Sequence, residues 1–443
     1  MKPFPLVVLL IFSFFLLLGF LVFAGVIPLF ERSPTPQGVG GSVSVWGTFP
    51  EVYLHEAIQN LNAKNNGAYT VLYQEVRGED FDRLLVEALA GGRGPDVVLL
   101  SQELILRHKD KIFALPYDNT FFTSRDFLDT FIEEGDLYLK DEGILGLPFS
   151  VDPLVMYWNR DILASRGVSQ VPKSWEEFFD FIPRVTVVDD VSNIARSGIA
   201  FGEFRNVSQA KDILAMLFLQ TGNPIVRQSE GIFSPTLGEK GDAVVRPIES
   251  ALRFYTQFSN PAKSIYTWNR SLPESKDFFI SGDLALYIGY ASDYQDIRSK
   301  SPHLNFDAAV VPQAEGQNRK TTFGRMTAAA VLKASKNSAT AFWAISEISG
   351  KDFVGLFSKA SGLPPARRDL LVAKPADPRL SVFYDSALIS RAWLDPDPEM
   401  SRSVFQSMVE NVVSGRSTEA DAVPRANKEL ISLLAPFNAR VSQ

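Results

Sequence analysis

The sequence contains no cysteine and only three histidines among its 443 residues. The missing thiol excludes disulfides, thiolate nucleophiles, iron–sulfur clusters and Cys-ligated zinc. The three histidines, His55, His108 and His303, are far apart along the chain. A metal site with several histidine ligands is therefore nearly excluded. We therefore predict no metal and no cofactor. Basic residues are also in the minority, 44 against 51 acidic residues, which argues against a general nucleic-acid binder, because such proteins need clustered basic surface.

Charge is absent from the start of the chain between Pro3 and Phe30. Residues 6–24 alone would span about 28 Å as a helix, close to the ~30 Å hydrocarbon thickness of a bilayer. Lys2 precedes this segment, which favours a cytoplasmic start and export of the rest. A signal peptide cleaved after Ala24 is the alternative, but the apolar run exceeds a usual signal core. We predict a transmembrane anchor or signal over 1–32 and a flexible tether over 33–44.

Strand and helix patterns alternate through the remaining chain. Strands are predicted at 42–46, 69–76 and 96–100, with helical apolar spacing at 53–64 and 80–89 between them. The third strand is apolar throughout, as in a sheet buried on both faces. This alternation predicts an α/β fold with a parallel sheet and right-handed crossovers.

Aromatic and polar residues are mixed where predicted strands end. These stretches are residues 46–51, 101–103, 287–293 and 393–395. Ligands in open α/β sheets bind beyond the carboxyl ends of strands. Sugars suit such a mixture, because their C–H faces pack on rings and their hydroxyls exchange hydrogen bonds with Asp, Glu, Asn and Gln. Core packing remains the alternative for each single residue.

Several motifs resemble those of the family 1 extracellular solute-binding proteins, the sugar-type receptors of ABC importers that are similar to maltose-binding protein. The signature segment is Gly146–Asp161, in which Arg160 and Trp158 stand where the family usually has Lys and Tyr. The remaining matches follow in the family's order along the chain. They are Pro172–Phe178, Phe279–Leu286, Ser361–Arg367 and Ser414–Ala420.

The resemblance implies a two-lobed periplasmic-binding-protein type II fold with hinge strands and a ligand cleft between the lobes. It places the N-lobe at 45–150 and 323–372, and the C-lobe at 151–322 and 373–443. Crossings between the lobes are expected near 149–152, 322–326 and 371–375.

The resemblance also implies ligand-binding residues. Trp46, Thr48 and Glu51 would line the N-lobe wall, and Asp152 takes the family's acidic sugar-contacting position. The other expected ligand-binding residues are Ser101, Gln102, Tyr290, Asp293 and Trp393. The third strand lacks the Asp-Arg pair of maltodextrin binders, which puts a maltodextrin ligand in doubt.

The function implied is binding of a solute, a mono- or oligosaccharide, on the outer face of the cytoplasmic membrane and its delivery to ABC permease subunits. No catalytic residue is predicted, because no nucleophile motif is present and Asp152 with Glu51 is the only carboxylate pair to nominate. A ligand-sensing receptor on the same fold is the first alternative, since fold alone does not define the partner. An exported glycan-active enzyme is the second.

Overall fold

The computed structural model describes Leu16 and residues 39–117, 122–191, 193–239, 246–316 and 319–438. The predicted anchor, apart from Leu16, and the first half of the predicted tether, residues 33–38, lie outside these residues. Within the described ranges, no helix has the length and hydropathy needed to cross a membrane. Residues 41–44 already belong to strand β1 (Gly41–Gly47), so the tether prediction is corrected at its end.

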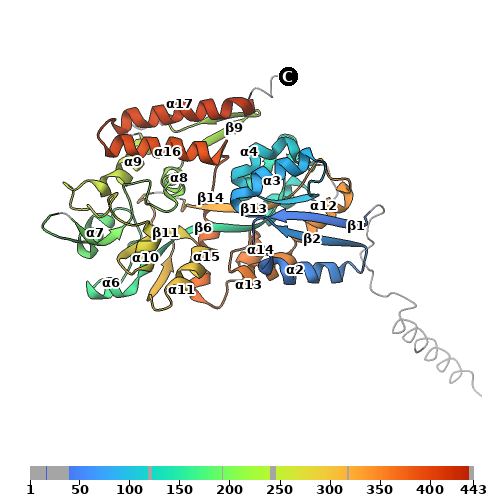
Figure 1. Cartoon of the computed structure of the whole chain (residues 1–443), viewed down its shortest axis with the longest axis horizontal. Helices are drawn as coiled ribbons and strands as arrows, with labels where there is room; N and C mark the ends of the chain where they lie inside the picture. The colour runs from blue at the N-terminus through green and yellow to red at the C-terminus, as the bar shows by residue number, and fades with distance from the viewer. Residues whose placement is uncertain are drawn as a thin grey trace, which may run out of the picture.

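One mixed sheet runs through the body of the molecule (Figure 1). Its strand order is β2-β1-β3-β13-β6-β11-β8-β7, with β12 paired to β6 and β14 paired to β13. The pairs β1–β2, β1–β3 and β8–β11 are parallel. The pairs β3–β13, β13–β6 and β6–β11, at the centre of the sheet, are antiparallel. The all-parallel prediction is therefore wrong at the centre of the sheet. The strands are β1, β2 (Tyr69–Glu75), β3 (Val97–Ser101), β6 (Leu147–Asn159), β7 (Val187–Val188), β8 (Ile194–Ile199), β11 (Leu284–Tyr290), β12 (Phe306–Ala309), β13 (Thr322–Val331) and β14 (Ser390–Arg391).

Helices cover both faces of this sheet. Around β1 to β3, the helices α3 and α4 lie on one face and α2 and α13 on the other (Figure 1). The α-helices are α2 (Glu51–Lys64), α3 (Gly78–Ala90), α4 (Ile105–His108), α5 (Ser124–Thr130), α6 (Arg160–Ser165), α7 (Phe178–Val185), α8 (Ala210–Gln220), α9 (Pro247–Thr256), α10 (Ser275–Ile280), α11 (Asp293–Lys300), α12 (Ser338–Ile348), α13 (Lys351–Ser361), α14 (Arg368–Leu371), α15 (Pro378–Leu388), α16 (Pro398–Val413) and α17 (Glu419–Asn438). Short 3₁₀ turns are η1 (Gln102–Leu104), η2 (Lys109–Lys111), η3 (Glu133–Tyr138) and η4 (Gln257–Ser259), and two small hairpins are β4 (Leu139–Lys140) with β5 (Gly143–Ile144) and β9 (Val226–Ser229) with β10 (Ile232–Pro235).

The buried apolar side chains form two separate cores. The first gathers most of those from β1 to the start of β6 and from β13 to α14. The second gathers most of those from the rest of β6 to β12 and those from α16. Strand β6 contributes Phe149 to the first core and Leu154 to the second, and β13 contributes Phe323 to the second and Met326 to the first. We call the elements around these cores the first and second lobes. Their exact residue boundaries stay a prediction.

The β9–β10 hairpin extends from the second lobe to the first. Its two-residue turn has positive φ at both Glu230 and Gly231, as a type I′ turn requires. Phe233 is buried in the first core, and Lys140 Nζ donates a hydrogen bond to Gln228 Oε1 at 2.9 Å. The lobes therefore touch at this hairpin as well as along the shared sheet.

Gly324, on the crossing strand β13, has no room for a side chain. A Cβ there would overlap Ser390 Oγ and lie 2.5 Å from Glu134 Oε2. We expect Gly324→Ala to lower the free energy of unfolding by about 1–3 kcal/mol, the usual cost of overpacking, in a chemical denaturation experiment. Gly355→Ala in α13 is the matched control, because no atom of the described residues lies within 4 Å of that Cβ and alanine favours a helix. Equal stability of the two variants would contradict the prediction.

Candidate functional site

The carboxyl ends of β1 and β3 meet at one edge of the sheet, because these neighbouring strands are parallel. Thr48 and Glu51 are exposed beyond β1, and Trp46 is half-buried on the same strand against the first core. Ser101 ends β3 and is also half-buried. The structure thus brings four of the predicted ligand-binding residues to the same edge.

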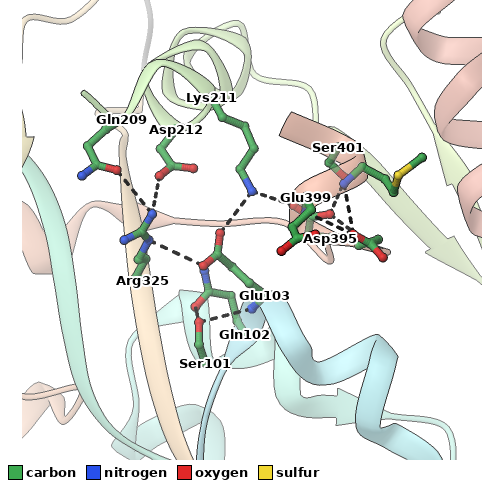
Figure 2. Close-up of polar contacts among 12 residues, drawn as sticks. Ser101, Gln102, Glu103, Gln209, Lys211, Asp212, Arg325, Asp395, Glu399 and Ser401 are labelled. Atoms are coloured by element: carbon green, nitrogen blue, oxygen red, sulfur yellow. Dashed lines mark hydrogen bonds and ion pairs between the residues drawn. The ribbon is translucent and has the colours of Figure 1, made fainter. Parts of the chain in front are cut away.

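A cluster of charged side chains lies where this edge faces the second lobe. Figure 2 shows Glu103, Lys211, Asp212, Arg325 and Asp395 pointing toward one another; we call these five residues the cleft cluster. Glu103 comes from η1 in the first lobe and Arg325 from the crossing strand β13. The remaining three come from the start of α8 and the segment before α16, which belong to the second lobe.

Arg325 holds one half of the cleft cluster together. Its Nη2 lies 2.8 Å from Asp212 Oδ2, and its Nε lies 3.6 Å from Glu103 Oε2. The guanidinium carbon sits 4.2 Å from the centre of the Tyr290 ring, which adds a cation–π contact. Tyr290 Oη in turn donates to Asp212 Oδ2 at 2.7 Å. Tyr290 is therefore a support for Arg325, and its buried ring is covered by the guanidinium.

Lys211 holds the other half. Its Nζ lies 2.9 Å from Asp395 Oδ2 and 3.2 Å from Glu103 Oε1, and only 7% of its side chain is exposed. Burial alone would lower the pKa of Lys211, but the two carboxylates outweigh this and raise it. For Glu103, burial would raise the pKa, but Arg325 and Lys211 lower it. The charged form of each partner thus stabilises the other.

The start of α8 explains how these charges enter the interior. Ala210 to Phe218 are buried without interruption, as expected for a helix surrounded by protein. Gln209, just before the helix, has a left-handed backbone with φ 59, an uncommon conformation for a residue other than glycine. Its Oε1 accepts a hydrogen bond from Arg325 Nη2 at 3.4 Å. The first turn of α8 is thereby fixed against β13.

Asp152 lies on β6 directly opposite Arg325 of β13. Its Oδ1 accepts a hydrogen bond from the backbone N–H of Ser292 at 3.0 Å. Burial raises the pKa of Asp152 to about 6, although the Ser292 hydrogen bonds and Arg325 act against this. The structure therefore places this predicted residue beside the cleft cluster.

Three predicted ligand-binding residues are corrected by their positions. Gln102 is fully buried; its Oε1 accepts from Met326 N and its Nε2 donates to Gly324 O, so it links η1 to β13. Asp293 is buried, and its carboxylate accepts hydrogen bonds from Lys276 Nζ, Tyr287 Oη and the backbone N–H of Tyr290. Trp393 is 3% exposed and packs against Phe405 in the second core. Their side chains are structural here, because burial and hydrogen bonding leave them nothing to present to a ligand.

The sequence prediction missed the cleft cluster itself. Lys211 and Asp212 lie at the start of a helix whose other residues are almost all apolar. Two adjacent charges in such a helix could have indicated that they pair with other charged residues in the interior. Arg325 and Glu103 gave no comparable pattern, because their partners are distant in the chain. Only the packing of the lobes brings them together.

The cluster offers hydrogen-bond donors and acceptors at close range. Asp212 Oδ1 is buried and has no hydrogen-bond partner among the residues that the structure describes, which is costly unless another group donates to it. Within the described ranges, no group of three His, Asp or Glu side chains is arranged to hold a metal ion. The arrangement suits recognition of a small polar molecule that both donates and accepts hydrogen bonds.

Solved structures of other proteins share this fold. The cyclic α-maltosyl-1,6-maltose binding protein of Arthrobacter globiformis has a TM-score of 0.73 and 15% identity, covering 89% of this chain and 99% of that one. The sugar-binding protein MalE of Xanthomonas citri has a TM-score of 0.70 and 19% identity, covering 91% and 99%. The ABC substrate-binding protein Lmo0181 of Listeria monocytogenes, in complex with cycloalternan, has a TM-score of 0.69 and 17% identity, covering 89% and 99%.

These TM-scores establish a common fold of the periplasmic-binding-protein type, with mixed α/β lobes. Membership of a family is shown by the sequence itself, in which residues 56–379 match the family model for bacterial extracellular solute-binding proteins. This match spans most of the chain, including the crossing strands and every member of the cleft cluster except Asp395. The chain therefore belongs to the bacterial extracellular solute-binding protein family.

Proposed function

We propose that the protein binds a carbohydrate outside the cytoplasm and delivers it to an ABC importer without chemical turnover. The observation that carries this proposal is the cleft cluster, which joins donors and acceptors from both lobes at one sheet edge. The similar structures named above bind sugars according to their descriptions. Closing the lobes on a ligand would add contacts that exist only in the closed form, which is how such a protein retains its ligand.

The site has the chemistry that sugar hydroxyls need. A hydroxyl can donate to Asp152 or to the unpartnered Asp212 Oδ1 and accept from Arg325. Trp46 supplies a half-buried indole beyond which the exposed Thr48 and Glu51 lie. We propose Trp46, Thr48, Glu51, Ser101 and Asp152 as ligand-facing residues, with Tyr290 supporting Arg325 behind them.

We further propose that the apolar segment at 6–24 anchors the protein in the membrane, with permease subunits as partners. Its length and lack of charge support this role. The mass of the mature protein tests it. A chain that starts at Gly25 would contradict the anchor, but not the binding function.

Asp152→Ala is expected to weaken carbohydrate binding. A hydrogen bond from a hydroxyl to a carboxylate contributes about 1.5–3 kcal/mol, so Kd should rise by about 10-fold to 150-fold at 1.4 kcal/mol per decade. Titration calorimetry with maltotetraose, cycloalternan and mannobiose measures this, because sugars of these kinds are bound in similar structures.

Asp129→Ala is the matched control, since Asp129 is exposed on α5 and pairs only with Arg125 in the described part of the chain. The control should bind as the unmodified protein does. Binding of no neutral sugar by the unmodified protein would argue against a carbohydrate ligand. Equal affinities of Asp152→Ala and Asp129→Ala would remove Asp152 from the site.

A further inference from the structure

Glu103 is the member of the cleft cluster that connects the two lobes. It belongs to η1 in the first lobe and pairs with Lys211 of the second lobe at 3.2 Å and with Arg325 of the crossing strand at 3.6 Å. Its side chain is 17% exposed. Ion pairs in such partly buried positions are screened by salt much less than surface pairs are. This contact can therefore hold the lobes together in solution.

Glu103 is not needed to neutralise either cation. Lys211 also pairs with Asp395 at 2.9 Å, and both residues belong to the second lobe. Arg325 of the crossing strand β13 also pairs with Asp212 of the second lobe at 2.8 Å. Loss of Glu103 would leave each cation with a carboxylate partner. What would be lost is the link between η1 and α8, so the role of Glu103 is separable from the folding of the second lobe.

We propose that Glu103 is an electrostatic latch that holds the two lobes together at the cleft cluster before any ligand binds. A ligand must then displace or replace the ion pairs of Glu103, and the closed-to-open ratio of the free protein sets part of the apparent affinity. This inference rests on and deepens the proposed function, since it concerns ligand access to the same residue cluster. The latch itself can be measured without any ligand.

The absence of cysteine makes a direct distance measurement straightforward. Val86→Cys on α3 and Ser407→Cys on α16 place spin labels at exposed positions, one on each lobe. Double electron–electron resonance on the ligand-free full chain in detergent then reports the distance between the lobes. We expect one dominant short distance for the chain with Glu103, and a shift toward longer distances in Glu103→Gln.

The size of that shift follows from the interaction removed. A hydrogen bond to a charged group contributes enough to change an equilibrium about tenfold or more. The Arg107–Asp397 pair at 3.6 Å and the Lys140–Gln228 hydrogen bond also join the lobes. We therefore expect the closed fraction to fall, while a closed population remains.

Glu79→Gln is the matched control, because Glu79 is exposed at the start of α3 and pairs with Arg77 on the same lobe. It should leave the distance distribution unchanged. Circular dichroism confirms folding of each variant, and Glu103→Asp, which keeps the charge but shortens the reach, takes over if Glu103→Gln does not fold. Coinciding distributions of the Glu103 variant and Glu79→Gln would overturn the latch. Failure to bind any sugar would instead affect only the proposed function.

Discussion

Replacing Lys211 by methionine is expected to lower the free energy of unfolding by about 3–5 kcal/mol, the cost of removing one partner of a buried ion pair. Asp395 is 1% exposed and would lose Lys211 as its cation, whereas Glu103 would keep Arg325 at 3.6 Å. Methionine matches the length of the lysine stem and packs adaptably. The loss would therefore come from the stranded Asp395 carboxylate and the weaker pairing of Glu103 more than from a cavity. Chemical denaturation of both proteins measures the difference.

Lys300→Met provides the matched control. Lys300 is 55% exposed and pairs with Asp296 at 3.2 Å, an arrangement typically worth about 0–1 kcal/mol. The double variant Lys211→Met with Asp395→Asn should recover part of the lost stability, because it removes one stranded charge. A destabilisation no larger than that of Lys300→Met would show that the Lys211 pairs contribute nothing to folding.

Glu134→Gln is expected to flatten the dependence of stability on pH. Glu134 is 1% exposed in η3, and its Oε2 accepts a hydrogen bond from Ser390 of β14. Its Oε1 has no partner in the described part of the chain. Burial raises the pKa of Glu134 to about 7, although Ser390 and the charge of Arg391 oppose the effect. The folded protein therefore keeps this proton up to about pH 7, whereas the unfolded chain releases it near the ordinary value of 4.5.

The sign of the effect follows from proton binding. Between pH 4.5 and 7 the folded state binds more protons at Glu134 than the unfolded state does, so stability falls as pH rises. At 1.36 kcal/mol per pKa unit the loss from this group amounts to about 3 kcal/mol. Glutamine cannot ionise, so the difference in unfolding free energy between pH 5 and pH 8 should shrink by about 2.5 kcal/mol, because the unfolded-state carboxyl is already largely ionised at pH 5. Glu79→Gln should keep the original difference, and an unchanged difference in Glu134→Gln would contradict the prediction.

Much of the architecture follows from local patterns in the sequence. The apolar spacing of the helices at 53–64 and 80–89 and the buried strand at 96–100 are visible without a structure, and the motif Gly146–Asp161 lies where β6 and α6 form. The motif Pro172–Phe178 shows where local patterns end. Helix α7 begins only at its last residue, Phe178, and the Ser174 hydroxyl donates a hydrogen bond to Glu315, which is distant in the chain.

The antiparallel centre of the sheet was also beyond local patterns. The residues of β6 and β13 are apolar enough for either a parallel or an antiparallel pairing. Their antiparallel orientation is set by how the chain crosses between the lobes. The same limit applies to ligand-facing residues. Gln102 and Trp393 have suitable chemistry and suitable positions in the sequence, yet both are buried by neighbours that are remote along the chain.

The sequence by itself determined the absence of thiol chemistry, the apolar start of the chain, the α/β character of the body and its resemblance to a binding-protein family. These depend on composition and on patterns within short segments. The tertiary structure alone decided the cleft cluster, because Glu103, Lys211, Arg325 and Asp395 come from four separate parts of the chain. An ion pair depends on the distance between two charges, and only folding of the two lobes against each other sets that distance.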